Sequence, residues 1–369
     1  MLRIMANRGR LDMSGIKVKH YLLFALIWLG YATLSLVWAG DRLAAMREIV
    51  FLFMGVSLIL LVVFYFNDIK DLTRFFDLWI LVLAAMICVG LWEYATGSHL
   101  IVSTLAHAER ITRAPTAVFG NQNDYATYLV LSIPFLISFV RYSRQYHKRL
   151  LGVAMLIASI FLLVATLSRA NYIAIAAGAA FWFFFLLRAR GKIKTSVVIC
   201  LFVLLAFAAA QGTMVRTIGN QLQTVTAELS QHTELNSIQV RLNLARNCLG
   251  FLVDSGGFGV GAGNTEYHME NFQVYDTGGI VNAHNWWLEI LTNYGLFIFA
   301  GYMLFYLGIL ISLLRVSRTL KDHREKMLCE ALLVATVVFP IAAFSSSTIM
   351  AQQTPWLFFA FLLGFLNYC

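Results

Sequence analysis

A histidine, His284, stands where the longest hydrophilic segment ends and an apolar run begins. Histidine titrates near neutral pH, so this side chain could act as a general base. Two tryptophans, Trp286 and Trp287, follow it. Tryptophan at such a boundary is typical of the aromatic belt at a membrane surface. The residues alone leave two interpretations open, a catalytic base or an interfacial anchor.

Arginines supply a second kind of chemistry. Arg169 lies in the short segment 168–171 between two long apolar runs, so its guanidinium must lie at or just below a membrane surface. A charge there is costly and usually functional, unless the side chain extends into the lipid headgroups. Arg241 and Arg246 lie in a stretch with helical spacing, five residues apart, and share one helix face only loosely. A solvated face is the simpler explanation for Arg246.

Glycines are concentrated in residues 256–263 and include Gly259 and Gly261. The segment lacks the Gly-Lys-Ser/Thr ending of a phosphate-binding loop, and no strand pattern precedes it. It forms either tight turns or a backbone that approaches a ligand closely and offers N–H donors. Metal-ligand spacing of His, Cys, Asp or Glu is absent, so we expect neither a metal nor a cofactor.

These residues must be positioned by helices that cross a membrane. The chain is 60% hydrophobic and 13% charged, whereas soluble domains carry about 45–50% apolar and about 25% charged residues. Its net charge of +9 is divided into short clusters between apolar runs, which excludes a nucleic-acid groove. We expect an all-α polytopic membrane protein with about ten transmembrane helices. The apolar runs are 21–39, 49–66, 76–94, 125–140, 150–167, 172–187, 196–210, 286–314, 327–344 and 355–368.

The basic residues predict the orientation. Of 28 Lys and Arg, 20 fall on one side of the membrane, which we expect to be cytoplasmic and to hold both termini. We divide the chain into residues 1–211 with seven helices, a partly helical outer loop at 212–283, and residues 284–369 with three helices. The overlong run 286–314 should tilt or have its first turns at the outer interface. The outer basic residues are all arginine, which suits phosphate: Arg42, Arg47, Arg110, Arg113, Arg169, Arg216, Arg241 and Arg246.

Several weak motifs, taken together, resemble the O-antigen ligase and polymerase family. The resemblance covers nearly the whole chain in the family's order, although the sequence begins at what resembles the family's third helix. The motifs are LSLVWAGD at 34–41, FGNQND at 119–124, SR at 168–169, RLNLAR at 241–246, GGFGVGAG at 256–263, AHNWWLE at 283–289 and YGL at 294–296.

The resemblance implies a fold like the type C membrane glycosyltransferases and a metal-independent reaction. An oligo- or polysaccharide would move from an undecaprenyl-diphosphate carrier to an acceptor hydroxyl at the outer face of the plasma membrane. By the same resemblance, His284 would activate the hydroxyl, and Arg169 and Arg241 would bind the departing diphosphate. The residues expected to contact substrate are Arg246, Asn285, Asn121, Asn123, Gly259 and Gly261.

The expected partners are the lipid-linked glycan donor, a glycan or lipid-linked acceptor and the bilayer, and beyond these a flippase and a chain-length regulator. A transporter or flippase of lipid-linked sugars is the main alternative. Ionisable residues within the apolar runs are few, mainly Asp77, Glu93 and Glu289, whereas proton-driven transporters need more. A non-catalytic assembly partner is a third interpretation. The motifs do not separate a polymerase from a ligase.

Overall fold

The structure is a computed structural model that describes residues 15–106, 113–183, 237–346 and 349–369. Every regular element within these ranges is helical, which confirms the predicted all-α class. The elements are α2 (Lys19–Leu34), η1 (Ser35–Val37), α3 (Arg42–Tyr65), α4 (Ile69–Thr96), α5 (Gln122–Tyr142), α6 (Tyr146–Ala165), α7 (Arg169–Phe181), α9 (Ser237–Asp254), α10 (Thr265–Phe272), α11 (Trp286–Thr319), α12 (His323–Ala342), η4 (Ile349–Ala351) and α13 (Gln353–Tyr368).

Six of the described helices are long and apolar enough to cross a membrane, which makes the chain a multi-pass membrane protein. They are α2 together with η1, α3, α4, α5, α6 and α11. Helices α12 and α13 correspond to the last two expected runs, but α12 carries several charges in its first turns and α13 has 16 residues. The expected run 196–210 and the end of run 172–187 lie outside the described residues. A total of ten spans therefore stays a prediction.

Acidic and amide side chains fix where five of the helices begin. Each accepts hydrogen bonds from first-turn N–H groups, which have no partner within the helix. Two of these residues, Asn121 and Asn285, are also expected to contact substrate, so they have a structural role as caps in any case. The caps are Asp41 for α3, Asp68 for α4, Asn121 for α5, Asn285 for α11 and Asp322 for α12.

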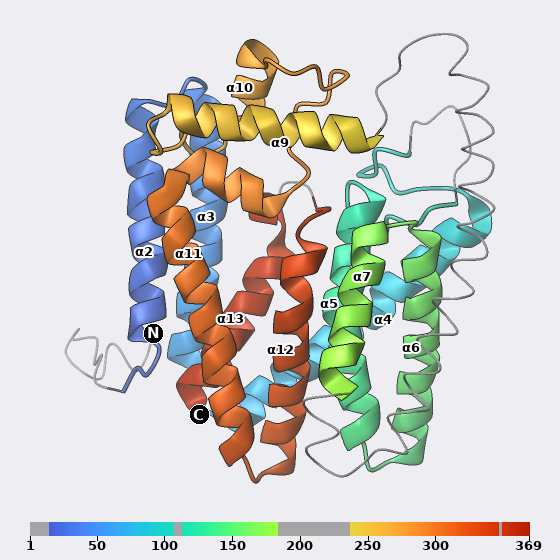
Figure 1. Ribbon diagram of the computed structural model, residues 1–369. Coiled ribbons are helices and arrows are strands. Elements are labelled where there is room, and N and C mark those ends of the chain that lie inside the picture. Colours follow the sequence, from blue (N-terminus) through green and yellow to red (C-terminus); the bar gives the residue numbers. More distant parts are fainter. Residues whose placement is uncertain (1–14, 107–112, 184–236, 347–348) are drawn as a thin grey trace.

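The long helices run side by side, while α9 lies across one end of them with α10 outermost (Figure 1). Helix α4 crosses the bundle obliquely (Figure 1). Both ends of the described chain lie opposite α9, where Lys17 donates its backbone N–H to Asn367 Oδ1 at 3.0 Å (Figure 1). The helix bundle thus has an α9 end and an opposite end that holds both chain ends. Which end of the bundle faces the cytoplasm stays a prediction.

Helix α11 is broken near its start at Gly295, whose φ of 73° and ψ of −176° are not helical. The part before Gly295 lies across the end of the bundle, and the part after it runs beside α2 (Figure 1). Backbone from the glycine-rich segment fills the break: Leu296 donates its N–H to Gly257 O at 2.9 Å, and Val260 donates to Thr292 O at 2.8 Å. The overlong run is therefore not one straight span, and its first turns lie at the α9 end.

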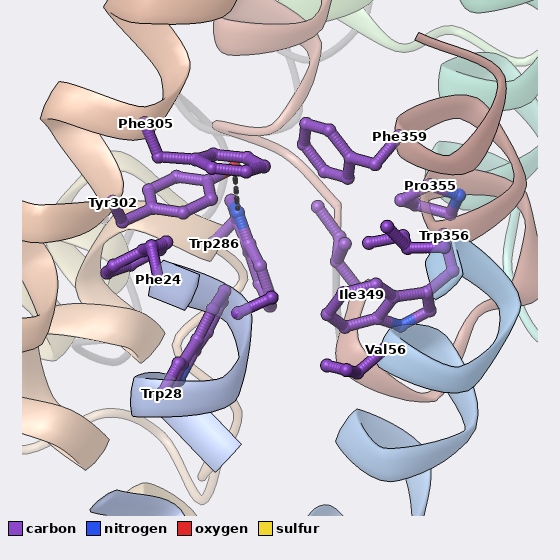
Figure 2. A pocket seen from close by; sticks show the side chains of 12 residues that line it. Phe24, Trp28, Val56, Trp286, Tyr302, Phe305, Ile349, Pro355, Trp356 and Phe359 are labelled. Carbon is purple, nitrogen blue, oxygen red and sulfur yellow. Dashed lines mark hydrogen bonds between the residues drawn. The ribbon is translucent and has the colours of Figure 1, made fainter. Parts of the chain in front are cut away.

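Aromatic side chains fill the space between α2, α3, α11 and α13 (Figure 2). Trp28 packs against Trp286, Tyr302 and Trp356 with ring centroids 6.3, 5.5 and 6.2 Å away. Trp286 Nε1 donates to Tyr302 Oη at 3.1 Å (Figure 2). The space left between these rings is about 20 Å³, room for about one water. This cluster is a core, and it supports the turn that contains His284.

At the other end of the molecule, one buried carboxylate joins three helices. Glu330 of α12 is 2% exposed and accepts from Arg141 Nη1 at 2.7 and 2.8 Å. It also accepts from Tyr142 Oη at 3.0 Å and Trp182 Nε1 at 2.8 Å. Removing one partner of a buried ion pair costs about 3–5 kcal/mol. Glu330 therefore clamps α5, α12 and the end of α7, the helices whose opposite ends carry the polar groups described next.

Candidate active site

A four-residue segment after α12, residues 343–346, brings three of the sequence motifs together. Ala343 O accepts from the Trp286 N–H at 3.0 Å and holds the start of α11. Ser345 Oγ accepts from Asn171 Nδ2 at 3.2 Å in the Ser-Arg loop. Ser346 Oγ donates to Asp124 Oδ1 at 2.6 Å in the asparagine motif. The histidine, Ser-Arg and asparagine motifs therefore meet at one end of the bundle.

Arg169 is the first residue of α7, and its side chain is exposed. The chain turns sharply just before it, because Leu167 has a φ of 58°, an uncommon value for a residue with a β-carbon. Asn171 is fully buried, and its Nδ2 donates to Ser168 Oγ at 2.9 Å. The Asn171 amide thus fixes the turn that presents Arg169.

Asn121 and Asn123 take part in the start of α5. Asn121 Oδ1 accepts from the N–H groups of Asn123 and Asp124 at 2.9 and 3.0 Å. Asn121 Nδ2 donates to Asp124 Oδ2 at 2.7 Å. The carbonyl of Asn123 accepts from Asn171 Nδ2 at 3.5 Å. These contacts give both asparagines a structural role, and their contact with substrate stays a prediction.

His284 lies in the turn between α10 and α11, with a left-handed backbone φ of 47°. The backbone N–H of His284 donates to Asn282 Oδ1 at 2.8 Å, and Asn282 Nδ2 donates to Glu266 Oε1 at 2.7 Å. Asn285 caps α11 by accepting from the Trp287 N–H at 3.0 Å. A strained backbone of this kind costs about 1–3 kcal/mol and is found preferentially at functional sites. The hydrogen bonds on both sides of His284 hold it there.

Burial lowers the pKa of the His284 imidazole below its ordinary value, and the positive charge of Arg241 lowers this pKa further. The carboxylate of Glu266 acts on the same pKa in the opposite direction. His284 is therefore neutral at neutral pH, which is the form that can take a proton from a hydroxyl. Arg241 of α9 and Glu266 of α10 are therefore both near enough to the imidazole for their charges to act on its pKa.

The second arginine of α9 has a different environment. Arg246 is exposed and lies over the Tyr275 ring, with its Cζ 5.4 Å from the centroid. The buried neighbour Asn247 fixes that tyrosine, because its Oδ1 accepts from the N–H groups of Val274 and Tyr275 at 3.0 and 2.9 Å. A cation–π contact at an exposed site contributes about 0.5–1 kcal/mol. Arg246 therefore packs on the loop, and its contact with substrate stays a prediction.

The glycine-rich segment 256–263 packs against the corner between α2 and α3. Trp38 Nε1 donates to Gly259 O at 3.0 Å. The Ala262 N–H donates to Ser35 Oγ at 2.9 Å. The motif at 34–41 and the glycine-rich motif at 256–263 therefore pack against each other.

Close backbone contacts explain why glycine occupies positions 259 and 261. Their φ values are 82° and 103°, and a β-carbon on Gly259 would lie 2.5 Å from Gly295 N. The N–H of Gly259 donates to Ser255 Oγ at 3.0 Å, and that of Gly261 donates to Asn293 O at 3.0 Å. Both donors are used within the protein, which favours the packing interpretation. Substrate contact by these two glycines stays a prediction.

Two cavities adjoin the site, and Ala351 lies in the wall of both. The first, which we name the apolar groove, measures about 700 Å³ and lies between α4, α5 and the start of α13. Its walls include Leu78, Val82 and Met86, with Asp124 also lining it. The second, the polar cavity, measures about 200 Å³ and lies between α3, α10 and the start of α11. Its lining includes Glu48, Glu266, Asn282, Ala283, Glu289 and Asn293.

Sequence reasoning missed the groups that hold the site in place. Asn171, Ser345 and Ser346 are buried and join different helices. Asn282 and Glu266 support His284 from the loop. The available signal was the presence of amide and hydroxyl residues beside apolar runs, since a buried polar group needs a hydrogen-bond partner. Among the described residues, no three His, Cys, Asp or Glu side chains are placed to share a metal ion.

Comparison with known proteins gives two matches. The family model described as O-Antigen ligase matches residues 154–303, which include Arg169, Arg241 and His284. The Teichuronic acid biosynthesis protein TuaE of Bacillus subtilis (strain 168) is 33% identical over 364 residues. The aligned region covers 98% of this chain and 74% of that protein.

Proposed function

Because this chain belongs to the O-antigen ligase and polymerase family, we propose that it transfers a glycan from an undecaprenyl-diphosphate carrier to an acceptor hydroxyl. His284 takes the hydroxyl proton, and the acceptor oxygen forms a bond to the anomeric carbon of the donor. The bond between that carbon and the diphosphate oxygen breaks, and the diphosphate leaves with the electron pair. Arg169 and Arg241 offset the negative charge that develops on it.

The observation that carries this proposal is the pairing of His284 with Arg241. A general base must be neutral and must stand beside the reacting hydroxyl. The half-buried imidazole of His284, with its lowered pKa, meets the first requirement. Arg241 supplies a phosphate-binding cation close to the same imidazole. Proton transfer and leaving-group stabilisation can therefore occur within one site.

The apolar groove supports a lipid-linked donor. Leu78 and Val82 line it and are 57% and 40% exposed, so this wall is accessible from the side of the helix bundle. An isoprenoid chain could enter there and leave its diphosphate near the Asp124 end, where Asn171 and the Ser-Arg loop lie. This path brings the diphosphate towards Arg169. Contacts from Asn121, Asn123, Asn285, Arg246, Gly259 and Gly261 belong to the same proposal.

The proposed location is the plasma membrane, with the active site on its outer face, where flippase and chain-length regulator partners would also act. The proposed chemistry needs no metal, because arginines take the role of a divalent cation on the diphosphate. Transfer in membranes should therefore continue in EDTA. A strict requirement for added magnesium or manganese would refute this part of the proposal.

The decisive experiment uses purified protein and an undecaprenyl-diphosphate oligosaccharide, with the products separated by size. Successive transfer gives a ladder and identifies a polymerase, while transfer of one glycan to a different acceptor identifies a ligase. Membership of the family does not favour the alternative of a transporter. Movement of the lipid-linked glycan across vesicles without any new glycosidic bond would refute the proposed transferase.

A further inference from the structure

We propose that Glu93, a buried carboxylate in the last turn of α4, is a positioning residue that selects the carrier lipid of the donor. It holds residues 116–121, which we name the groove rim, in the wall of the apolar groove. This inference rests on the proposed function and adds a residue that determines specificity for a long isoprenoid chain. Its basis is the set of hydrogen bonds that converge on Glu93.

The groove rim forms part of the wall of the cavity. Val118, Phe119, Gly120 and Asn121 all line the apolar groove. Val118 is 45% exposed, so this wall offers an apolar surface to an occupant. Phe119 packs against Tyr128 of α5, which also lines the groove, with ring centroids 5.5 Å apart. An isoprenoid chain in the groove would therefore contact the rim as well as α4.

The groove rim lies outside the helices, and a single carboxylate accepts the hydrogen bonds at its start. Glu93 is 0% exposed, and its Oε2 accepts from the backbone N–H groups of Thr116 and Ala117 at 2.7 and 2.6 Å. Its Oε1 accepts from the Thr116 hydroxyl at 3.2 Å. Hydrogen bonds to an ionised carboxylate are about twice as strong as those between neutral groups. Glu93 therefore fixes the position of the rim relative to α4.

The same carboxylate contacts the stretch that follows α4. The Leu100 N–H donates to Glu93 Oε1 at 3.5 Å, and His99 Nδ1 lies 3.4 Å from that oxygen. Thr104 donates its N–H and its hydroxyl to Gly120 O at 2.8 and 3.0 Å. These contacts join the stretch after α4 to the groove rim, so both depend on Glu93.

The backbone of the rim is strained beside Glu93. Ala117 is fully buried and has a φ of 47°, an uncommon value for a residue with a β-carbon. Such a conformation persists only where its surroundings enforce it, and it is found preferentially where ligands bind. Without the carboxylate this backbone could relax, and Val118, the next residue, would move with it. The apolar wall of the groove would then change shape.

A purely structural carboxylate is the simpler explanation for a buried Glu93. Its loss would lower the amount of folded protein and reduce transfer from every donor by the same factor. A positioning carboxylate acts through the shape of the groove, so its loss weakens binding most for a donor that fills the groove. The length of the donor's isoprenoid chain therefore separates the two explanations.

The test uses two donors that carry the same glycan diphosphate, one on an undecaprenyl chain and one on a farnesyl chain. With wild-type protein, kcat/KM for the undecaprenyl donor should exceed that for the farnesyl donor by at least about tenfold, because each buried methylene group strengthens binding about fourfold. Equal use of the two donors overturns the inference and leaves the transferase proposal intact. Absence of transfer from both donors refutes the transferase proposal, and this inference with it.

Variants of Glu93 then assign the preference to this residue. Glu93→Ala should lower the ratio of the two kcat/KM values several-fold, through a higher KM for the undecaprenyl donor with kcat unchanged. Glu93→Gln keeps an oxygen that can accept from the Thr116 and Ala117 N–H groups, so its ratio should lie between those of Glu93→Ala and wild type. A lower kcat with both donors and a wild-type ratio would show that Glu93 is only structural.

Changes in the connecting segment itself complete the test. Val118→Ser alters the rim surface and leaves Glu93 in place, and it should also lower the ratio several-fold. Ile101→Ser is the matched control and should keep the wild-type ratio, because Ile101 is 87% exposed in the same segment and does not line the groove. A wild-type ratio in both Glu93→Gln and Val118→Ser overturns the inference, even where Glu93→Ala is too unstable to purify.

Discussion

At the scale of single residues, the backbone of His284 explains how a loop can hold a base in one orientation. A φ of 47° is unfavourable for any residue with a β-carbon, and loop flexibility would normally relieve it. Here Asn282 accepts a hydrogen bond from the backbone N–H of His284 on one side. On the other side, the Asn285 side chain caps the start of α11. The backbone of the histidine is therefore held in position from both sides.

Replacing His284 tests both its chemistry and its strain. We expect His284→Ala and His284→Gly to lower turnover by about 10²–10⁴, since both remove the general base. Glycine adopts a positive φ without strain, so His284→Gly should be the more stable of the two by about 1 kcal/mol. Turnover at matched expression and thermal unfolding in detergent measure the two effects. Near-normal product from His284→Ala would return this residue to the role of an interfacial anchor.

The pH dependence of turnover tests the contact with Arg241. The base acts in its neutral form, so turnover falls as the pH drops through the His284 pKa, which burial and Arg241 lower below 6.5. Arg241→Gln removes a positive charge, so that pKa should rise and the acid limb should move to higher pH. Arg241→Lys keeps the charge and should leave the limb in place while raising the donor KM, because a point charge lacks the bidentate fork.

Arg246→Gln is the control for this comparison, since Arg246 lies on the same helix over Tyr275. Its acid limb should match that of wild type. An unchanged limb in Arg241→Gln would show that the charge of Arg241 does not reach the imidazole.

At the scale of elements, the break in α11 depends on the glycine segment that fills it. Gly259→Ala places a β-carbon against Gly295 N and Asn293 O, at 2.5 and 2.7 Å, where neither backbone can move away easily. Gly278→Ala is the matched control, because Gly278 also has a positive φ of 62° but nothing within 4 Å of the added carbon. Both changes incur backbone strain of about 1–2 kcal/mol. Overpacking should cost Gly259→Ala about 1–3 kcal/mol more.

Thermal unfolding of the two glycine variants side by side measures this difference. Turnover should fall with stability in Gly259→Ala, since the displaced loop carries Glu266 and the turn before His284. Equal stability of the two variants would mean that the loop and α11 separate without cost.

The elements were predictable to different degrees. The long apolar run 125–140 predicted helix α5 (Gln122–Tyr142) directly, because only a helix satisfies its own backbone in lipid. The break at Gly295 was not predictable, because a single glycine is often tolerated in a helix. It arises from contact with residues 257–261, and a sequence pattern does not record which distant segment packs on a helix. The same limit applies to the 343–346 segment that joins the motifs of the site.

At the scale of the whole molecule, orientation in the membrane can be measured directly. In a background without the native cysteines, we expect Val274→Cys to react with an impermeant maleimide in intact cells. Val274 is 83% exposed in the loop between α10 and α11, which we expect to lie outside the cell. Lys321→Cys, in the exposed turn between α11 and α12, should react only after lysis. Labelling of Lys321→Cys in intact cells would reverse the orientation derived from the basic residues.

Composition was enough to predict the molecule's class, because 60% hydrophobic residues cannot be covered by the polar groups of a soluble fold. The candidate site was predictable as a set of motifs, among them His284, Arg169 and Arg241. How these motifs meet was not predictable, since hydrogen bonds such as Asn171–Ser345 and Asp124–Ser346 join residues 174 and 222 positions apart.

The contact between the α2–α3 corner and the loop before α10 has a consequence for synthesis. The Asp41 N–H donates to Asn264 Oδ1, which lies 223 residues later in the chain. A ribosome that adds about 5–20 residues per second reaches Asn264 roughly 10–45 s after Asp41. During that interval the polar groups of the corner can be solvated only by water and lipid headgroups. The chain therefore completes the end that carries the candidate site late, after most of its helices have been synthesised.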